Sequence, residues 1–227
     1  MISYLLWTIT ASLLGLSISA VFAGILRLPR TVFLVPYVLF VGIFLYGYVR
    51  WEDLNVGELI RQNCIWGVVA AAVVAIFMIR NVLSQPASPR SQGSKLLFEL
   101  FWFGIVYGAV DGLFLSVFPV LMTSQAFTTL GDTTLGKIEF ALLALIASEL
   151  ITLAYHVGYP EFRNSSLIFA AFGNGIITIA YLVSLNPISS IVSHVVMHIA
   201  AVWHGSEHTV QLPPHYSNTE KKQAAYR

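Results

Sequence analysis

One stretch of this 227-residue chain, residues 193–208, holds four of its six histidines. It reads S-H-V-V-M-H-I-A-A-V-W-H-G-S-E-H. His194 and His198 lie four residues apart in an apolar run, and on a helix this spacing places both imidazoles on one face. His204 and His208 repeat the spacing just beyond. Because imidazoles inside a membrane need a partner, a metal ion or a water-filled cavity, this stretch is predicted to form part of a site.

Further ionisable side chains interrupt the apolar segments that precede this stretch, namely Asp111, Glu149 and His156. Ionisable residues within membrane segments usually face the protein interior and mark functional sites. Neutral histidine combined with carboxylate suits Zn²⁺ or iron. The chain could therefore supply three imidazoles and one carboxylate to one ion, from His156, His194, His198 and Asp111.

Such an ion could catalyse hydrolysis if one of its coordination positions stayed open for water. Asp111 or Glu149 would then act as the base that activates this water. Glu149 and His156 share a helix face but differ by about 10 Å in depth at a rise of about 1.5 Å per residue, so we expect Glu149 outside the direct ligand set. His204 and His208 are secondary metal candidates, because they fall at the membrane edge, where histidines often stabilise helix ends.

Two alternatives to a metal centre remain open at this point. Two of the histidines could be axial ligands of a haem. Alternatively, the histidines and acids could form hydrogen bonds between helices, as packing contacts or as a proton-handling network.

The composition fixes the broad class of protein. The chain is 57% hydrophobic and only 10% charged, with a mean hydropathy of +0.77, whereas soluble domains carry about 25% charged residues. We therefore predict an all-α, polytopic integral membrane protein of a plasma or inner membrane. The expected partners are the lipid bilayer and other membrane subunits, and the net charge of +1 argues against nucleic acid. The single cysteine, Cys64, excludes an internal disulfide framework.

Seven segments are apolar and long enough, or nearly so, to span a bilayer, which takes about 20 residues. They are residues 3–26, 32–49, 62–83, 96–124, 136–157, 165–184 and 187–204. Lys and Arg concentrate in the loops after the first and third segments and in the tail, which predicts an outside N-terminus and a cytoplasmic C-terminus. The aromatic residues of 32–49 and 96–124 are expected to face lipid or the core.

The predicted organisation has four parts. Residues 1–83 form a three-helix membrane scaffold, and the Pro/Ser/Gly-rich residues 84–95 form a flexible cytoplasmic linker. Residues 96–204 form a four-helix membrane unit that carries the His/carboxylate site. Residues 205–227 form a polar C-terminal tail, which begins as a strap along the surface.

A glycine stripe in the fourth segment, Gly104, Gly108 and Gly112, predicts close approach of a neighbouring helix. Asp111 is three residues from Gly108 and so lies near the same packed face. The stripe therefore predicts that Asp111 faces another helix rather than lipid.

The order of these residues resembles a known family. An acid in the fourth segment, a histidine late in the fifth and His-x-x-x-His in the seventh are similar to the CAAX-protease and bacteriocin-processing (CPBP) membrane metalloenzymes. The similarity covers roughly residues 100–204, and its nearest part is the stretch 173–198. It implies that His156 and His194 are metal ligands or activate water, and that His198 replaces the final Asn or Asp of the family pattern.

The chain departs from that family pattern at two positions. The family has a Glu-Glu pair followed by Arg where this chain has Asp111 alone, and Phe four residues before the histidine where this chain has Thr152. The leading hypothesis is a metal-dependent intramembrane hydrolase, resembling a protease. The alternatives are a non-enzymatic membrane subunit that binds haem or pigment or uses its histidines structurally, and a proton-coupled carrier.

Overall fold

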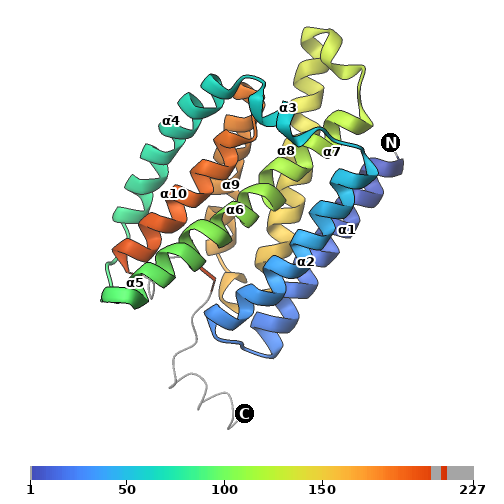
Figure 1. Ribbon diagram of the computed structural model, residues 1–227. Helices are drawn as coiled ribbons and strands as arrows, with labels where there is room; N and C mark the ends of the chain where they lie inside the picture. The colour runs from blue at the N-terminus through green and yellow to red at the C-terminus, as the bar shows by residue number, and fades with distance from the viewer. Residues whose placement is uncertain (1, 206–210, 214–227) are drawn as a thin grey trace.

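The computed structural model describes residues 2–205 and 211–213, and this part of the chain is helical with no strand (Figure 1). The longer helices are α1 (Ile2–Ile18), α2 (Arg30–Trp51), α4 (Cys64–Leu83), α8 (Thr134–Val157), α9 (Ser166–Ser184) and α10 (Ile188–His204). The short helix α3 (Val56–Arg61) connects α2 to α4.

Six of the described helical runs are long and apolar enough to cross a membrane. They are Ile2–Ile25, Arg30–Trp51, Cys64–Leu83, Gly93–Ala126, Thr134–Val157 and Ser166–Ser184. These runs coincide with the first six predicted segments, which confirms an all-α protein with several candidate membrane spans. The seventh predicted segment corresponds to α10, an apolar helix of 17 residues.

The 34-residue run Gly93–Ala126 is the longest of these and is not a uniform α-helix. It consists of α5 (Gly93–Glu99), a π-helical segment Leu100–Val106, α6 (Tyr107–Asp111), a second π-helical segment Gly112–Val117 and α7 (Phe118–Ala126). At about 1.5 Å per residue the run is about 51 Å long, and it crosses the front of the bundle diagonally in Figure 1. Asp111 therefore lies where α6 meets a π-helical segment, a feature found often at functional sites.

The glycine stripe of this run packs directly on α10. A Cβ atom added at Gly108 would lie 2.8 Å from the Cα of Val195, and one at Gly112 would lie 2.9 Å from the Cα of Ile191. Real Cβ atoms do not approach a backbone this closely, so only glycine allows this helix spacing. The predicted close approach is confirmed, and the neighbouring helix is the one that carries the histidine pair.

A tight turn separates α9 from α10 at the predicted position. Leu185 adopts a left-handed conformation with a φ of 52°, and the Asn186 side chain accepts a hydrogen bond from the Ile188 amide at 2.9 Å. The Asn186 amide group also donates to the carbonyl oxygen of Gln62 at 2.6 Å. The turn is thereby fixed to the segment between α3 and α4, and α10 runs antiparallel to α9.

The helices of residues 1–83 surround the four-helix unit. α1 packs along α8, and α4 packs along both α10 and α9 (Figure 1). The segment after α4 lies against the end of α10, where His204 Nε2 donates to the Gln85 carbonyl oxygen at 2.8 Å. The described residues of the tail, 211–213, lie at the same end, where Arg30 Nε donates to the Pro213 carbonyl oxygen at 2.6 Å. Both halves of the chain therefore contribute residues around the site.

Candidate functional site

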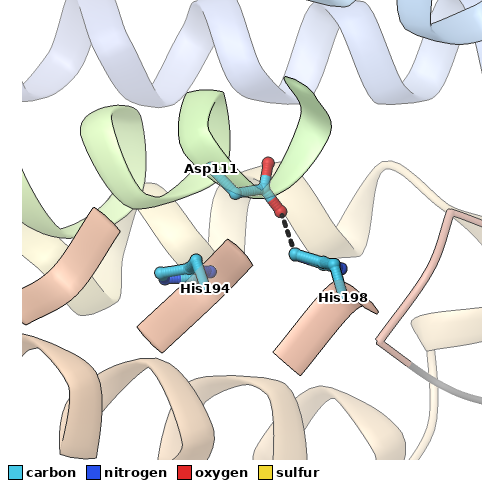
Figure 2. Close-up of side chains that lie close together, drawn as sticks. All are labelled: Asp111, His194 and His198. Atoms are coloured by element: carbon cyan, nitrogen blue, oxygen red, sulfur yellow. Dashed lines mark ion pairs between the residues drawn. The ribbon is translucent and has the colours of Figure 1, made fainter. Parts of the chain in front are cut away.

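Asp111, His194 and His198 meet where the glycine stripe brings α6 against α10. Each offers one ligand atom, and these atoms all lie within 4.8 Å of one another (Figure 2). His198 Nε2 is 3.4 Å from Asp111 Oδ2, and the two imidazole rings are stacked with centroids 6.0 Å apart. All three residues are buried, with exposures between 1% and 3%. The i, i+4 spacing of the histidines and the glycine stripe together account for this arrangement.

The imidazoles of this cluster have unused hydrogen-bonding capacity. Both nitrogens of His194 and both nitrogens of His198 are buried and have no hydrogen-bond partner among the described residues. Buried polar groups in native proteins are nearly always paired, and an unpaired one costs about 1–3 kcal/mol. The described residues therefore leave these nitrogens free to bind an ion, another ligand or water.

Tyr37 fixes the other side of the Asp111 carboxylate. Its hydroxyl donates to Asp111 Oδ1 at 2.5 Å, which leaves Oδ2 directed at His198. The ring of Tyr107, one turn before Asp111, lies 4.7 Å from the His198 ring. The carboxylate and one imidazole thus each have a buried aromatic residue that holds them in place.

Four buried tyrosines form a hydrogen-bonded cluster around Asp111. Tyr159 donates to the Tyr155 hydroxyl at 2.5 Å, and the Tyr155 and Tyr107 hydroxyls share a hydrogen bond of 3.1 Å. Tyr37 stacks on Tyr155, with ring centroids 5.1 Å apart. Residues from α2, α6, α8 and the turn after α8 therefore contribute to one rigid wall of the site.

The cluster lies at the inner end of a cavity of about 430 Å³. Asp111, His156, His194 and His198 all contribute to its lining. Asn81, Ser84 and Gln85, at the end of α4, line its other end together with residues 211–213. A volume in the range of about 300–1,000 Å³ is typical of pockets that hold small molecules, so a substrate could reach the cluster.

His156 shares the cavity but is not part of the three-residue cluster. Its Nδ1 donates to the Thr152 carbonyl oxygen at 2.8 Å, and its ring contacts Phe162 with centroids 4.9 Å apart. This hydrogen bond leaves Nε2 of a neutral imidazole as an acceptor. The expected set of three imidazoles and one carboxylate is therefore reduced to two imidazoles and one carboxylate, with the third imidazole in the cavity wall.

Glu149 does not line the cavity. It faces α9, where a Cβ added at Gly175 would lie 3.1 Å from Glu149 Oε1. Neighbouring polar residues of α8 and α9 satisfy one another: the Asn174 amide group donates to the Ser148 hydroxyl at 2.8 Å, and this hydroxyl is 2.9 Å from that of Thr178. Both carboxylate oxygens of Glu149 lack a hydrogen-bond partner among the described residues. Glu149 therefore lies outside the cluster of Asp111, His194 and His198.

The two secondary metal candidates are not part of the cluster either. His204 hydrogen-bonds to Gln85 and so connects the end of α10 to the segment after α4. His208 lies outside the described residues.

Sequence reasoning did not single out the tyrosines. Tyr107 precedes Asp111 by four residues and Tyr155 is adjacent to His156, so their spacing to an ionisable residue was an available signal. Tyr37 lies 74 residues from Asp111 and could be found only from the tertiary contact.

The cluster has a recognisable coordination chemistry. Two histidines and one carboxylate are the ligand set of several catalytic zinc sites and of non-haem Fe(II) enzymes, and both classes keep positions open for water or substrate. Comparison with known proteins adds no family to this description: no protein-family model, no curated protein and no solved structure matches the chain.

Proposed function

We propose that Asp111, His194 and His198 bind one divalent metal ion, zinc or iron, and that the protein is a metal-dependent hydrolase acting within the membrane. The observation that carries the proposal is the convergence of one nitrogen from each of two buried histidines and one oxygen of a buried carboxylate, all within 4.8 Å of one another. The resemblance of residues 100–204 to the CPBP metalloenzymes supports the same chemistry.

The distances between the three ligand atoms are compatible with a bound ion after small rotations of the side chains. Metal–nitrogen and metal–oxygen bonds of about 2.0–2.2 Å place ligand atoms about 3.3 Å apart in a tetrahedral site. The three ligand atoms lie within 4.8 Å of one another, so rotations of the side chains are sufficient to close the set. Asp111 then acts as a ligand, and Tyr37 holds it through the oxygen that faces away from His198.

Charge also favours a cation. A buried carboxylate in low dielectric is costly unless it is paired. No Lys or Arg is among the described residues that line the cavity with Asp111. A divalent ion would supply the missing positive charge and bind one nitrogen of each imidazole at the same time.

Hydrolysis is the chemistry that the open side of such an ion provides. A bound metal lowers the pKa of a coordinated water to about 7 and polarises a carbonyl group. His156 lines the same cavity with Nε2 available as a proton acceptor, so it replaces Glu149 as the candidate base. Asp111 is then occupied as a ligand.

A haem is less compatible with this geometry. Axial ligands of a bis-histidine haem lie on opposite faces of the porphyrin. His194 and His198 come from one face of one helix, and the porphyrin plane would have to cut through α10 to separate them. A purely structural role for the pair leaves both nitrogens of His194 without a hydrogen-bond partner among the described residues.

The proposal includes seven membrane spans, with an outside N-terminus and a cytoplasmic C-terminus. α10 is about 25 Å long at about 1.5 Å per residue, close to the hydrocarbon thickness of about 30 Å. It runs beside α4 and α9, both of which are long enough to span. The cavity then opens toward the cytoplasmic face, where Asn81 and Gln85 lie.

Metal analysis of the purified protein tests the proposal. We expect one zinc or iron ion per chain and its loss in both His194→Ala and Asp111→Asn, the second of which keeps the side-chain volume. His204→Gln is the matched control, because this histidine lies on the same helix and bonds to Gln85, and it should retain the ion.

Two results would contradict the proposal. Wild-type protein that binds no metal after incubation with zinc or iron(II), or Asp111→Asn protein that retains the ion, would exclude a metal centre at this cluster. A Soret band in the absorption spectrum would instead support haem. Gel filtration of each variant shows whether loss of metal reflects misfolding.

A further inference from the structure

One side wall of the cavity reaches the outer surface of the helix bundle. Phe77 of α4 and Phe169 and Phe172 of α9 line the cavity, yet they are 45%, 68% and 64% exposed. All three lie in helices that are long and apolar enough to span a membrane. In a bilayer, the outer faces of these rings would contact lipid tails, so the cavity is bordered by lipid between α4 and α9.

The two helices are in contact along only part of their length. Val74 and Met78 of α4 pack with Ile177 and Ala180 of α9 in one small buried cluster. Further along α9, Gly173 lines the cavity, and a Cβ added there would have no atom within 4 Å. The gap between α4 and α9 is therefore closed at one end and open beside Gly173.

The lining has two kinds of chemistry. Phenylalanine and methionine side chains provide an apolar wall, which includes Phe77 and Met197. Asn81, Ser84 and Gln85 provide uncharged hydrogen-bonding groups at the membrane face. The described lining residues include no Lys or Arg, so a phosphate head group next to Asn81 and Gln85 would find no basic side chain to pair with.

We propose that the substrate is a membrane amphiphile with a single hydrocarbon chain and an uncharged polar head, joined by an ester or amide bond, which reaches the metal site between α4 and α9. This proposal rests on the hydrolase function proposed above. The chain lies against the aromatic wall, the head lies toward Asn81 and Gln85, and the acyl carbon lies next to Asp111. The cavity of about 430 Å³ suits one chain segment rather than a two-chain lipid.

The reaction balances without a further reactant. The oxygen of water adds to the acyl carbon, and the C–O bond of the ester or the C–N bond of the amide breaks. The leaving oxygen or nitrogen takes a proton of the water. The products are a carboxylic acid and an alcohol or amine.

A photoreactive monoacylglycerol, with a diazirine in its acyl chain, tests where an amphiphile binds. In vesicles containing the full-length protein, we expect crosslinks concentrated on peptides of α4 and α9, and competition by unlabelled monoacylglycerol. Gly173→Phe should reduce these crosslinks by about tenfold or more, because a bulky ring fills the open space. Gly47→Phe is the control, since an added side chain at Gly47 on α2 also meets no atom within 4 Å but does not line the cavity.

The crosslinking results test the amphiphile-binding site, and the metal content tests the proposed function separately. Crosslinks spread evenly over all lipid-exposed helices, or unchanged in Gly173→Phe, would overturn the binding site. Equal competition by a single-chain phospholipid would overturn the uncharged head group. Metal content measured on the same samples is independent: Gly173→Phe protein should keep its ion, and wild-type protein that binds the probe but no metal would overturn the proposed function alone.

Discussion

Asp111 is the residue on which the candidate site depends, because it connects two sets of contacts. One carboxylate oxygen accepts from Tyr37, and the other faces His198 at 3.4 Å. A carboxylate that is fixed on one side by a phenol presents a defined oxygen to an ion on the other side. Loss of such an outer contact typically lowers metal affinity by about 10–100-fold.

We expect Tyr37→Phe to weaken metal binding by about 10–100-fold while leaving the fold intact, because it removes only the hydroxyl that orients Asp111. Competition with a metal chelator of known affinity measures the change. Tyr46→Phe is the matched control, since Tyr46 lies on the same helix and is 68% exposed. Equal affinities in the two variants would show that Tyr37 does not support the ligand.

His156 distinguishes a three-ligand site from the four-ligand site that the sequence alone predicts. Its Nδ1 is engaged with Thr152, and its ring lies outside the cluster of converging ligand atoms. We therefore expect His156→Gln protein to retain its metal ion in full, while His198→Gln loses it. Elemental analysis of both variants measures how much metal each retains. Loss of metal from His156→Gln would support the four-ligand site instead.

At the scale of elements, the packing of α6 on α10 creates the site. Gly104, Gly108 and Gly112 bring the two helices close enough for Asp111 to reach histidines one turn apart. The sequence was sufficient to predict this contact, because a four-residue glycine repeat and a four-residue histidine repeat each define a helix face. The sequence could not predict the two π-helical segments that flank α6. Such segments depend on packing rather than on local helix propensity.

We expect Gly108→Ala to lower stability by about 1–3 kcal/mol and to reduce metal binding, because the added methyl group would lie 2.8 Å from the Val195 Cα and force α10 away. Thermal unfolding in detergent measures stability, and elemental analysis measures the ion. Gly42→Ala is the control, since an added Cβ there meets no atom within 4 Å. A Gly108→Ala protein as stable as Gly42→Ala, with its ion bound, would contradict this account of the interface.

The limits of sequence prediction are clearest where partners are far apart along the chain. The span boundaries follow from runs of apolar residues, and they agree with the helices to within a few residues at most ends. The division between the predicted segments 165–184 and 187–204 agrees with the turn at Leu185. In contrast, Tyr37 and Asn81 contribute to the site from α2 and α4, and no periodicity connects them to Asp111. For this reason residues 1–83 were expected to be scaffold alone.

At the scale of the whole molecule, the mouth of the cavity lies at one end of the helix bundle. The end of α4, the end of α10 and residues 211–213 meet there, and hydrogen bonds from His204 to Gln85 and from Arg30 to Pro213 hold them together. Arg30, Arg90 and Lys95 belong to loops or helix starts at this same end. Since basic loops usually face the cytoplasm, we predict that the cavity mouth faces the cytoplasmic side.

The single native cysteine allows this orientation to be tested. Cys64 is the first residue of α4, and the cavity mouth lies at the other end of that helix. We expect a membrane-impermeant maleimide to label Cys64 in intact cells. A Ser94→Cys variant in a Cys64→Ser background should be labelled only after permeabilisation, because Ser94 is exposed on α5 at the cavity end. The reverse pattern would place the cavity mouth outside, and labelling of both positions from one side would mean that α4 does not span the membrane. Because α10 runs beside α4 and carries the histidine pair, the same result shows from which side of the membrane the proposed metal site is reached.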